Sequence, residues 1–360
     1  MGNNINNWSR RSVLKASVVG AVALSTSSMW SSLRAQTKRI VVRDDGGVYT
    51  KAYTEVFYRP FQEATGIEVI GVQANAEPTA QILSMVDAGS YTWDMAKISQ
   101  PAIKMLTQGQ KKYLEAHGLG NDPIVAQMPE HFMSEYGVGT NVYTTVLAYR
   151  KDAFEGRQAP TSWKDFYDVQ GFPGRRALRR HPFDTIEQAL LADGVAVANV
   201  YPCDLERAFS ALDRIKNDVS VFWTSGAQVE QLLVSGEVDM VPVWVSRAQS
   251  ARSSNAPVGI VWDQNIWGLD SWAILAGTPN AAACREFIKF TCDPERQAAL
   301  TKYFPAGVTH PRAFDFIDPA VAADCPSYPD HIAKGLPIDA QYWTEKQGTA
   351  LERYNAWLLS

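Results

Sequence analysis

The sequence has few of the residues on which catalytic and metal chemistry depends. Its 360 residues include five histidines and four cysteines, and no two cysteines form a C-x-x-C pair. It contains no G-x-S-x-G elbow, no H-E-x-x-H pair and no phosphate-binding P-loop. These absences argue against hydrolase, zinc-protease and nucleotide-hydrolysing activity. We therefore predict a protein that is not an enzyme and that holds no cofactor or metal.

Basic residues are not in excess either. The formal net charge is −4 at pH 7, and lysine and arginine form no cluster. Nucleic acids and anionic lipid surfaces are recognised through such clusters. We therefore expect no nucleic-acid partner.

The chain has no apolar run long enough to span a membrane, but its amino terminus has the layout of an export signal. Arg10-Arg11 precedes a mildly apolar stretch over residues 16–30, and Ala35 offers a small residue for cleavage. A positive start, a short apolar middle and a small-residue end are typical of a signal peptide, here of the twin-arginine type. The serines and threonine in the stretch disfavour an uncleaved anchor. We predict that residues 1–35 are removed on export to the periplasm, which takes away four basic residues and no acids and brings the charge from −4 to −8.

The four cysteines, Cys203, Cys284, Cys292 and Cys325, would be able to form disulfides in the periplasm. Cys284 and Cys292 fall on one predicted helix, eight residues apart, a rise of about 12 Å that is too long for a direct bridge. Buried free thiols are the favoured interpretation, and the disulfide state stays open.

Hydrophobic periodicity predicts an α/β fold. A β-branched run at 39–43 breaks at 44–47, a helical pattern covers 49–65, and a strand follows at 67–72. The alternation continues along the chain, which indicates mostly parallel sheets flanked by helices. Ligands on such sheets lie at the carboxyl ends of the strands, so the loop at 44–47 is a natural ligand position. Shorter strands are predicted at 258–261 and 271–275, whereas Gly137-Val138-Gly139 is interpreted as a turn.

The length favours about two domains. We expect lobe 1 at 36–148 with part of 271–360, and lobe 2 at 149–270 with part of the carboxyl-terminal helices. The chain is expected to cross between the lobes near Ala148 and Asp270.

Several segments in this order carry a family resemblance. They are Asp45-Gly46-Gly47-Val48-Tyr49, Pro160-Thr161-Ser162-Trp163-Lys164-Asp165-Phe166, Phe172-Pro173-Gly174-Arg175-Arg176, Trp223-Thr224-Ser225-Gly226-Ala227-Gln228, Trp244-Val245-Ser246-Arg247 and Leu269-Asp270-Ser271. Together they resemble the spermidine/putrescine-type periplasmic solute-binding proteins of ABC transporters, nearest to the γ-aminobutyrate-binding members. The resemblance covers nearly all of the mature chain. It implies a two-lobed, hinged clamp, expected to be a monomer, that closes on a small amine-bearing solute and presents it to a membrane permease. A sensor that uses the same clamp remains an alternative.

The resemblance also implies ligand contacts. Trp244 would pack on an alkyl chain and attract an ammonium group, and Asp270 would hold that ammonium. Asp184 and Glu187, three residues apart on one helical face, match two acids of polyamine binders. Each of these residues also has a purely structural interpretation, as core, salt bridge or cap.

Arg247 distinguishes between ligand classes. A guanidinium repels a diamine but can donate two parallel hydrogen bonds to a carboxylate. Arg247 with Asp270 therefore favours a zwitterion such as γ-aminobutyrate, with putrescine or spermidine as the alternative and an exported enzyme as the remote one. Further candidates are Tyr49, Gln100 and Ser225 at the cleft edge, Asp45 and Gly47 in the first loop, and Arg179, Arg180 and Arg252 as other carboxylate partners. Ser225 is equally well explained as a helix N-cap.

Overall fold

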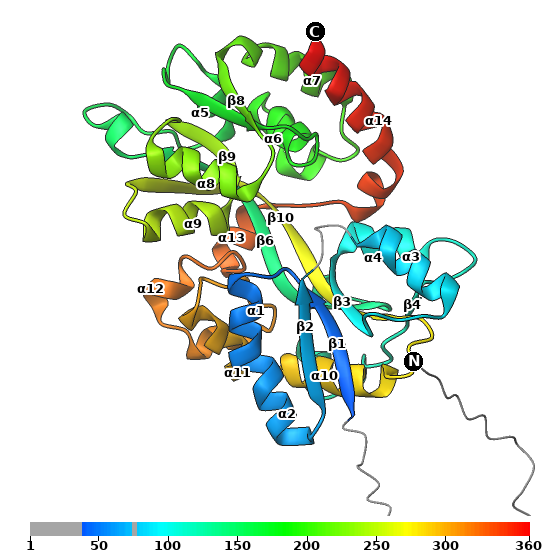
Figure 1. Ribbon diagram of the computed structural model, residues 1–360. Helices are drawn as coiled ribbons and strands as arrows, with labels where there is room; N and C mark the ends of the chain where they lie inside the picture. Colours follow the sequence, from blue (N-terminus) through cyan, green and yellow to red (C-terminus); the bar gives the residue numbers. More distant parts are fainter. Residues whose placement is uncertain (1–37, 74–77) are drawn as a thin grey trace, which may run out of the picture. The chain divides into compact units, whose positions relative to one another are not determined.

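The computed structural model describes residues 38–73 and 78–360, so the predicted signal segment at 1–35 lies outside the described residues. Figure 1 shows a mixed sheet flanked by helices. Its main path runs β2-β1-β3-β10-β6-β9-β7-β8, with β4 and β11 paired to β10 and β5 paired to β6. The strands are β1 (Arg39–Asp44), β2 (Glu68–Gln73), β3 (Met95–Ser99), β4 (Leu114–Glu115), β5 (Met133–Ser134), β6 (Gly137–Arg150), β7 (Arg176–Arg179), β8 (Val219–Trp223), β9 (Met240–Trp244), β10 (Val258–Leu275) and β11 (Leu336–Pro337).

Two groups of parallel strands make up the ends of this sheet. We call lobe 1 the part built around β1, β2 and β3, and lobe 2 the part built around β7, β8 and β9. Within each group the strands pair in parallel, as the alternating pattern predicts. The helices are α1 (Val48–Tyr53), α2 (Arg59–Thr65), α3 (Thr79–Ala88), α4 (Gln100–Thr107), α5 (Trp163–Tyr167), α6 (Thr185–Ala192), α7 (Leu205–Asp213), α8 (Gly226–Ser235), α9 (Val245–Ser253), α10 (Ala281–Thr291), α11 (Pro294–Ala299), α12 (Pro319–Ala322), α13 (Pro329–Lys334) and α14 (Ala340–Leu359).

The long strands β6 and β10 connect the two groups (Figure 1). They pair antiparallel with each other, while β10 pairs with β3 of lobe 1 and β6 pairs with β9 of lobe 2. The predicted strands at 258–261 and 271–275 are therefore one continuous strand. The turn predicted at 137–139 is wrong, because both glycines belong to β6.

Close packing explains those two glycines. A Cβ at Gly137 would lie 2.5 Å from the Ile103 side chain, and one at Gly139 would lie 2.7 Å from the carbonyl oxygen of Phe132. Such distances leave no room for a side chain, so the glycines mark crowded strand positions rather than a turn.

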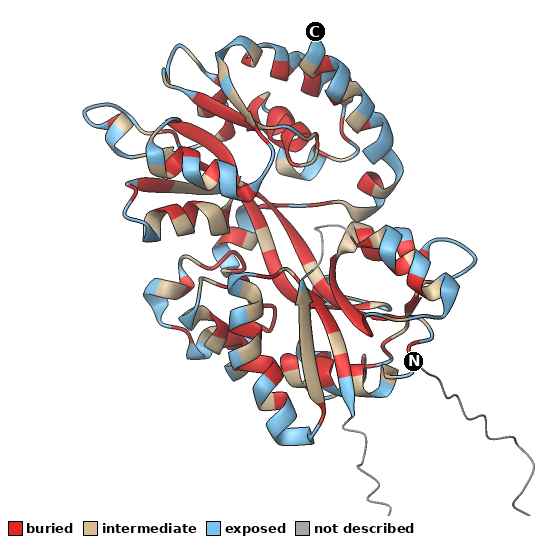
Figure 2. Ribbon diagram, viewed as in Figure 1, coloured by how far each residue is buried: buried red, intermediate tan, exposed pale blue. Residues whose placement is uncertain are grey.

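Large apolar side chains fill the core on both sides of β6 and β10, and Figure 2 shows the strands as mostly buried. Phe57, Trp272 and Phe287 pack in lobe 1, whereas Trp163 and Trp343 pack in lobe 2. Full burial of side chains of this size contributes about 1.5–3 kcal/mol each. The helices that follow β10 are shared: α10 packs into lobe 1 and α14 into lobe 2.

All four cysteines are buried free thiols, which confirms the favoured interpretation. Burial raises the pKa of the Cys292 and Cys325 thiols to about 12, so both stay protonated at neutral pH. No helix within the described residues is long and apolar enough to cross a membrane.

Candidate functional site

The loop after β1 is a fixed platform. The Asp44 carboxylate accepts hydrogen bonds from the Gly46 amide at 2.9 Å, the Tyr58 hydroxyl at 2.7 Å and the Thr50 hydroxyl. Gly47 is the N-cap residue of α1 and has a φ of 59°, a conformation that favours glycine. The loop therefore holds Asp45 and Tyr49 in defined positions at the carboxyl end of β1.

Asp45 and Asp270 share one partner, Lys97 of β3. The Lys97 ammonium lies 2.8 Å from Asp270 Oδ2, is bonded to Asp45, and sits 4.8 Å from the centre of the Tyr49 ring. Its side chain is only 1% exposed. Arg43 completes this Lys97 cluster (Arg43, Asp45, Lys97, Asp270), because it donates to the Lys97 carbonyl at 2.7 Å and lies 3.5 Å from Asp45.

Electrostatics keep Lys97 charged. Burial alone would lower the pKa of Lys97, but Asp270 and Asp45 outweigh it and hold that pKa well above its usual range. Burial raises the pKa of Asp270, and the Lys97 charge opposes the shift. The two acids that a ligand ammonium would seek therefore already have a cation of the protein beside them.

In lobe 2 the parallel strands end on three large side chains: Arg179 of β7, Trp223 of β8 and Trp244 of β9. The two indole rings meet edge to face with centroids 5.5 Å apart. The Arg179 guanidinium lies 4.9 Å from the Trp244 ring and 5.8 Å from the Trp223 ring. From the sequence we expected a ligand ammonium over the Trp244 ring. In the structure the cation beside this ring is Arg179 of the chain itself.

Asp184 joins these residues to form the Arg179 cluster (Arg179, Asp184, Trp223, Trp244). Its Oδ2 accepts from the Thr145 hydroxyl of β6 at 2.9 Å and from Arg179 Nη1 at 3.2 Å. Burial raises the pKa of Asp184, and the charge of Arg179 and the hydrogen bonds to the carboxylate offset this rise only in part. Asp184 caps α6 with a φ of 67°, an uncommon backbone conformation for aspartate. Among the described residues, the hydrogen bonds that the Arg179 guanidinium donates all come from Nη1, so Nη2 and Nε have no acceptor there.

Glu187 lies deeper than its predicted role requires. Its side chain is fully buried, and its Oε1 accepts from the Tyr201 hydroxyl at 2.6 Å and from the Trp343 indole at 2.5 Å. Burial and the nearby Asp184 charge raise its pKa to about 8. At neutral pH Glu187 is therefore mostly protonated, and this geometry favours a structural role.

Arg247 lies in the first turn of α9. Its Nη1 is 3.2 Å from Glu230 of α8, and 43% of its side chain is exposed. Gly226, the first residue of α8, lets Arg247 lie close, since a Cβ there would be 2.6 Å from Arg247 Nε. Ser225 is exposed, and its hydroxyl accepts from the Gln228 amide at 3.2 Å, which is the N-cap interpretation.

The two clusters lie along the same strand. Asn141 of β6 pairs with Asp270, and Thr145 of β6 pairs with Trp244. Asn141 and Thr145 are four residues apart, a distance of about 13 Å along a strand, and their side chains point to the same face of the sheet. Burial raises the pKa of Tyr49, and the charge of Arg247 from lobe 2 contributes a small opposing shift.

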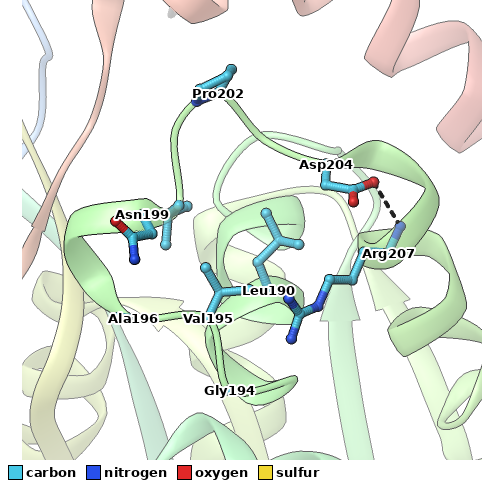
Figure 3. Close-up of a pocket in the computed structure, with 9 residues that line it drawn as sticks. Leu190, Gly194, Val195, Ala196, Asn199, Pro202, Asp204 and Arg207 are labelled. Atoms are coloured by element: carbon cyan, nitrogen blue, oxygen red, sulfur yellow. Dashed lines mark hydrogen bonds between the residues drawn. The ribbon is translucent and has the colours of Figure 1, made fainter.

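Gln100 directly follows Ser99, the strand partner of Asp270, but its hydrogen bond leads away from the Lys97 cluster. It starts α4, donates to the His131 carbonyl at 3.4 Å, and lines a cavity of about 690 Å³ between α4 and the start of α14. A second cavity, of about 390 Å³, lies within lobe 2 (Figure 3). Leu190 and Val195 form its apolar wall, and Arg207 borders it but is engaged by Asp193. The residues that line these two cavities include no member of the Lys97 or Arg179 clusters.

Sequence reasoning missed Lys97 and Glu230. Lys97 was detectable as a lone cation in the apolar run Met95-Ala96-Lys97-Ile98, since a lysine in a buried strand requires a carboxylate partner. Its partners are more than fifty residues distant in sequence, so their identity comes only from the fold. Among the described residues, no group of three or more acids, histidines and cysteines is arranged to hold a metal ion.

A mixed α/β chain of two lobes, with aromatic and charged side chains gathered at its strand ends, has the arrangement expected of a solute-binding protein. A model of the bacterial extracellular solute-binding protein family matches residues 57–324, and the chain belongs to that family. The γ-aminobutyric acid-binding protein of Pseudomonas aeruginosa is 31% identical over 95% of this chain and 97% of its own length.

Two further relatives extend the comparison. The structure of an ABC transporter substrate-binding protein from Bradyrhizobium japonicum is 36% identical with a TM-score of 0.83, over 89% of this chain and 99% of the other. The spermidine/putrescine-binding periplasmic protein of Escherichia coli is 25% identical over 90% of each chain. The predicted family and fold class are thus confirmed.

Proposed function

We propose that this protein is the substrate-binding component of an ABC importer and captures a small ω-amino acid such as γ-aminobutyrate. The relatives named above support the transporter class and the ligand. The charge balance of the site is the observation that carries the choice of ligand.

The site has equal numbers of formal positive and negative charges. Counted as formal charges, the ion pairs of the two clusters and of Arg247 comprise four cations and four carboxylates: Arg43, Lys97, Arg179 and Arg247 against Asp45, Asp270, Asp184 and Glu230. Glu187 adds little negative charge because it is mostly protonated. A site without net charge suits a ligand without net charge, and an ω-amino acid at neutral pH is a zwitterion.

The two ends of the ligand have different partners. In the described structure only Oδ2 of Asp270 is engaged, so Oδ1 is available to the ligand ammonium, with the Tyr49 ring beside it. At the other end, Arg247 and Arg179 each engage one terminal nitrogen with an acid and keep another for a carboxylate. Trp244 would cover the alkyl chain between the two ends.

Diamine binding is the second candidate, because spermidine/putrescine-binding proteins are among the relatives. Asp45, Asp184 and Asp270 would have to hold the two ammonium groups. Each of these acids already has a basic side chain as partner, and a second ammonium near Arg179 and Arg247 would be repelled. This opposition makes the diamine the weaker candidate.

The test is calorimetric titration of the mature protein with γ-aminobutyrate, alongside Arg247→Ala. Losing a charge-assisted pair of hydrogen bonds should weaken binding about ten- to hundredfold. Arg214→Ala is the matched control, because Arg214 lies in lobe 2 as an exposed partner of Asp193. Equal affinities in the wild type and in Arg247→Ala would refute the role given to Arg247.

The same proposal includes export by the twin-arginine route to the periplasm, a monomeric state, and a permease as the membrane partner. Amino-terminal sequencing of the protein recovered from the periplasm tests removal of residues 1–35. An uncleaved amino terminus would reject it.

A further inference from the structure

Lys97 occupies a position made for a ligand cation. Two carboxylates and an aromatic ring surround its ammonium: Asp270 at 2.8 Å, Asp45 in direct contact, and the Tyr49 ring at 4.8 Å. Such a combination is the usual setting for an amine group in a binding protein. Here the amine is supplied by the chain.

Building on the proposed function, we infer that Lys97 is a specificity-determining residue that excludes dications from the site. It is a resident ammonium that neutralises the acids of lobe 1, so that a ligand with one positive and one negative end is accepted and a diamine is refused.

The lysine cannot leave this position easily. Lys97 is in the middle of β3, where its backbone pairs with Trp272 of β10 and its neighbour Ala96 pairs with Arg43 of β1. Its side chain is 1% exposed, and moving it out would leave two half-buried carboxylates without that partner. A diamine would therefore have to compete with a tethered cation that is present in every molecule.

The charges at the lobe 2 end of the site also disfavour a diamine. A diamine whose first ammonium bound Oδ1 of Asp270 would extend its second towards Arg179 and Arg247. Each of those guanidiniums has one acid partner, Asp184 and Glu230 respectively. Both carboxylates of these pairs already have a basic partner, so the second ammonium would gain no net attraction.

The experiment is titration of putrescine and of γ-aminobutyrate into wild type, Lys97→Met and Lys97→Arg. Methionine keeps the length and removes the charge, which leaves Asp45 and Asp270 in need of a cation. Putrescine affinity should rise at least about tenfold in Lys97→Met and stay at the wild-type level in Lys97→Arg. Lys111→Met is the matched control, because Lys111 is an exposed lysine paired with Asp87 and its loss should leave both affinities unchanged.

A second measurement covers the case in which Lys97→Met folds poorly. Thermal unfolding of Lys97→Gln, which keeps hydrogen-bonding capacity, should show a rise in Tm of several degrees in millimolar putrescine, while the wild type shows none, because a ligand stabilises the fold that binds it. A folded Lys97→Met with unchanged putrescine affinity, or equal Tm shifts in Lys97→Gln and the wild type, overturns the inference.

This experiment tests the role of Lys97 separately from the proposed ligand. If the wild type fails to bind γ-aminobutyrate, the proposed ligand is wrong. The inference about Lys97 stands or falls on the change in putrescine affinity alone.

Discussion

At the scale of single residues, the site is defined by how each charge is partnered. Asp270 and Arg247 were predicted from the sequence as the two ligand-binding ends, and the structure gives each a partner from the chain: Lys97 for Asp270 and Glu230 for Arg247. Their roles towards a ligand remain predictions. Partnered charges are held in position before the ligand arrives, which lowers the entropy cost of binding.

Glu187 leads to a prediction about stability and pH. Its pKa is about 8 in the fold against 4.5 for the free side chain, so the folded state holds a proton that the unfolded state releases between these values. The stability that comes with this proton is full below pH 4.5 and is lost as the pH rises through 8. Glu187→Gln keeps an acceptor for Tyr201 and Trp343 and removes the titration.

The Tm of Glu187→Gln relative to the wild type should therefore increase from pH 5 to pH 9, by at least about 2 °C. Glu345→Gln, at an exposed position of α14, is the control and should show no such trend. Parallel Tm curves for the wild type and Glu187→Gln across this pH range would mean that Glu187 is ionised in the fold.

At the scale of helices and strands, the start of α8 positions Arg247. A Cβ at Gly226 would fall 2.6 Å from Arg247 Nε and 3.3 Å from the Trp244 ring. Gly226→Ala should displace the guanidinium from the site and weaken γ-aminobutyrate binding about tenfold, with little loss of stability. Gly348→Ala in α14, where a Cβ meets nothing within 4 Å, should leave affinity unchanged. Unchanged affinity in Gly226→Ala would show that Arg247 does not depend on this contact.

Element boundaries were predictable where the pattern was local. The first strand and the helical stretch from 49 to 65 follow from periodicity, and the start of α8 follows from Ser225 as its N-cap. The continuity of β10 did not, because the polar run Asp263-Gln264-Asn265 reads as a break. Gln264 has a φ of 53° and the pairing with β6 shifts there, yet the strand continues because Asn265 is fully buried and donates to the His331 carbonyl at 2.7 Å.

At the scale of the whole molecule, the sequence predicted the class better than the site. An ordered set of short segments identifies the family, since each segment occupies a fixed place in a common fold. The composition of the site depends on residues that the fold brings together from different strands, as Lys97, Asp45 and Asp270 show. For this reason the pairing of acids and bases, which decides the ligand class, could not be predicted from local patterns.

The central claim is that the site accepts a zwitterion and refuses a dication. Its most direct test is calorimetric titration of the mature wild-type protein, freed of bound ligand by unfolding and refolding, with γ-aminobutyrate and putrescine in parallel. The account predicts binding of γ-aminobutyrate and at least about a hundredfold weaker binding of putrescine. Tight binding of putrescine without binding of γ-aminobutyrate would contradict it.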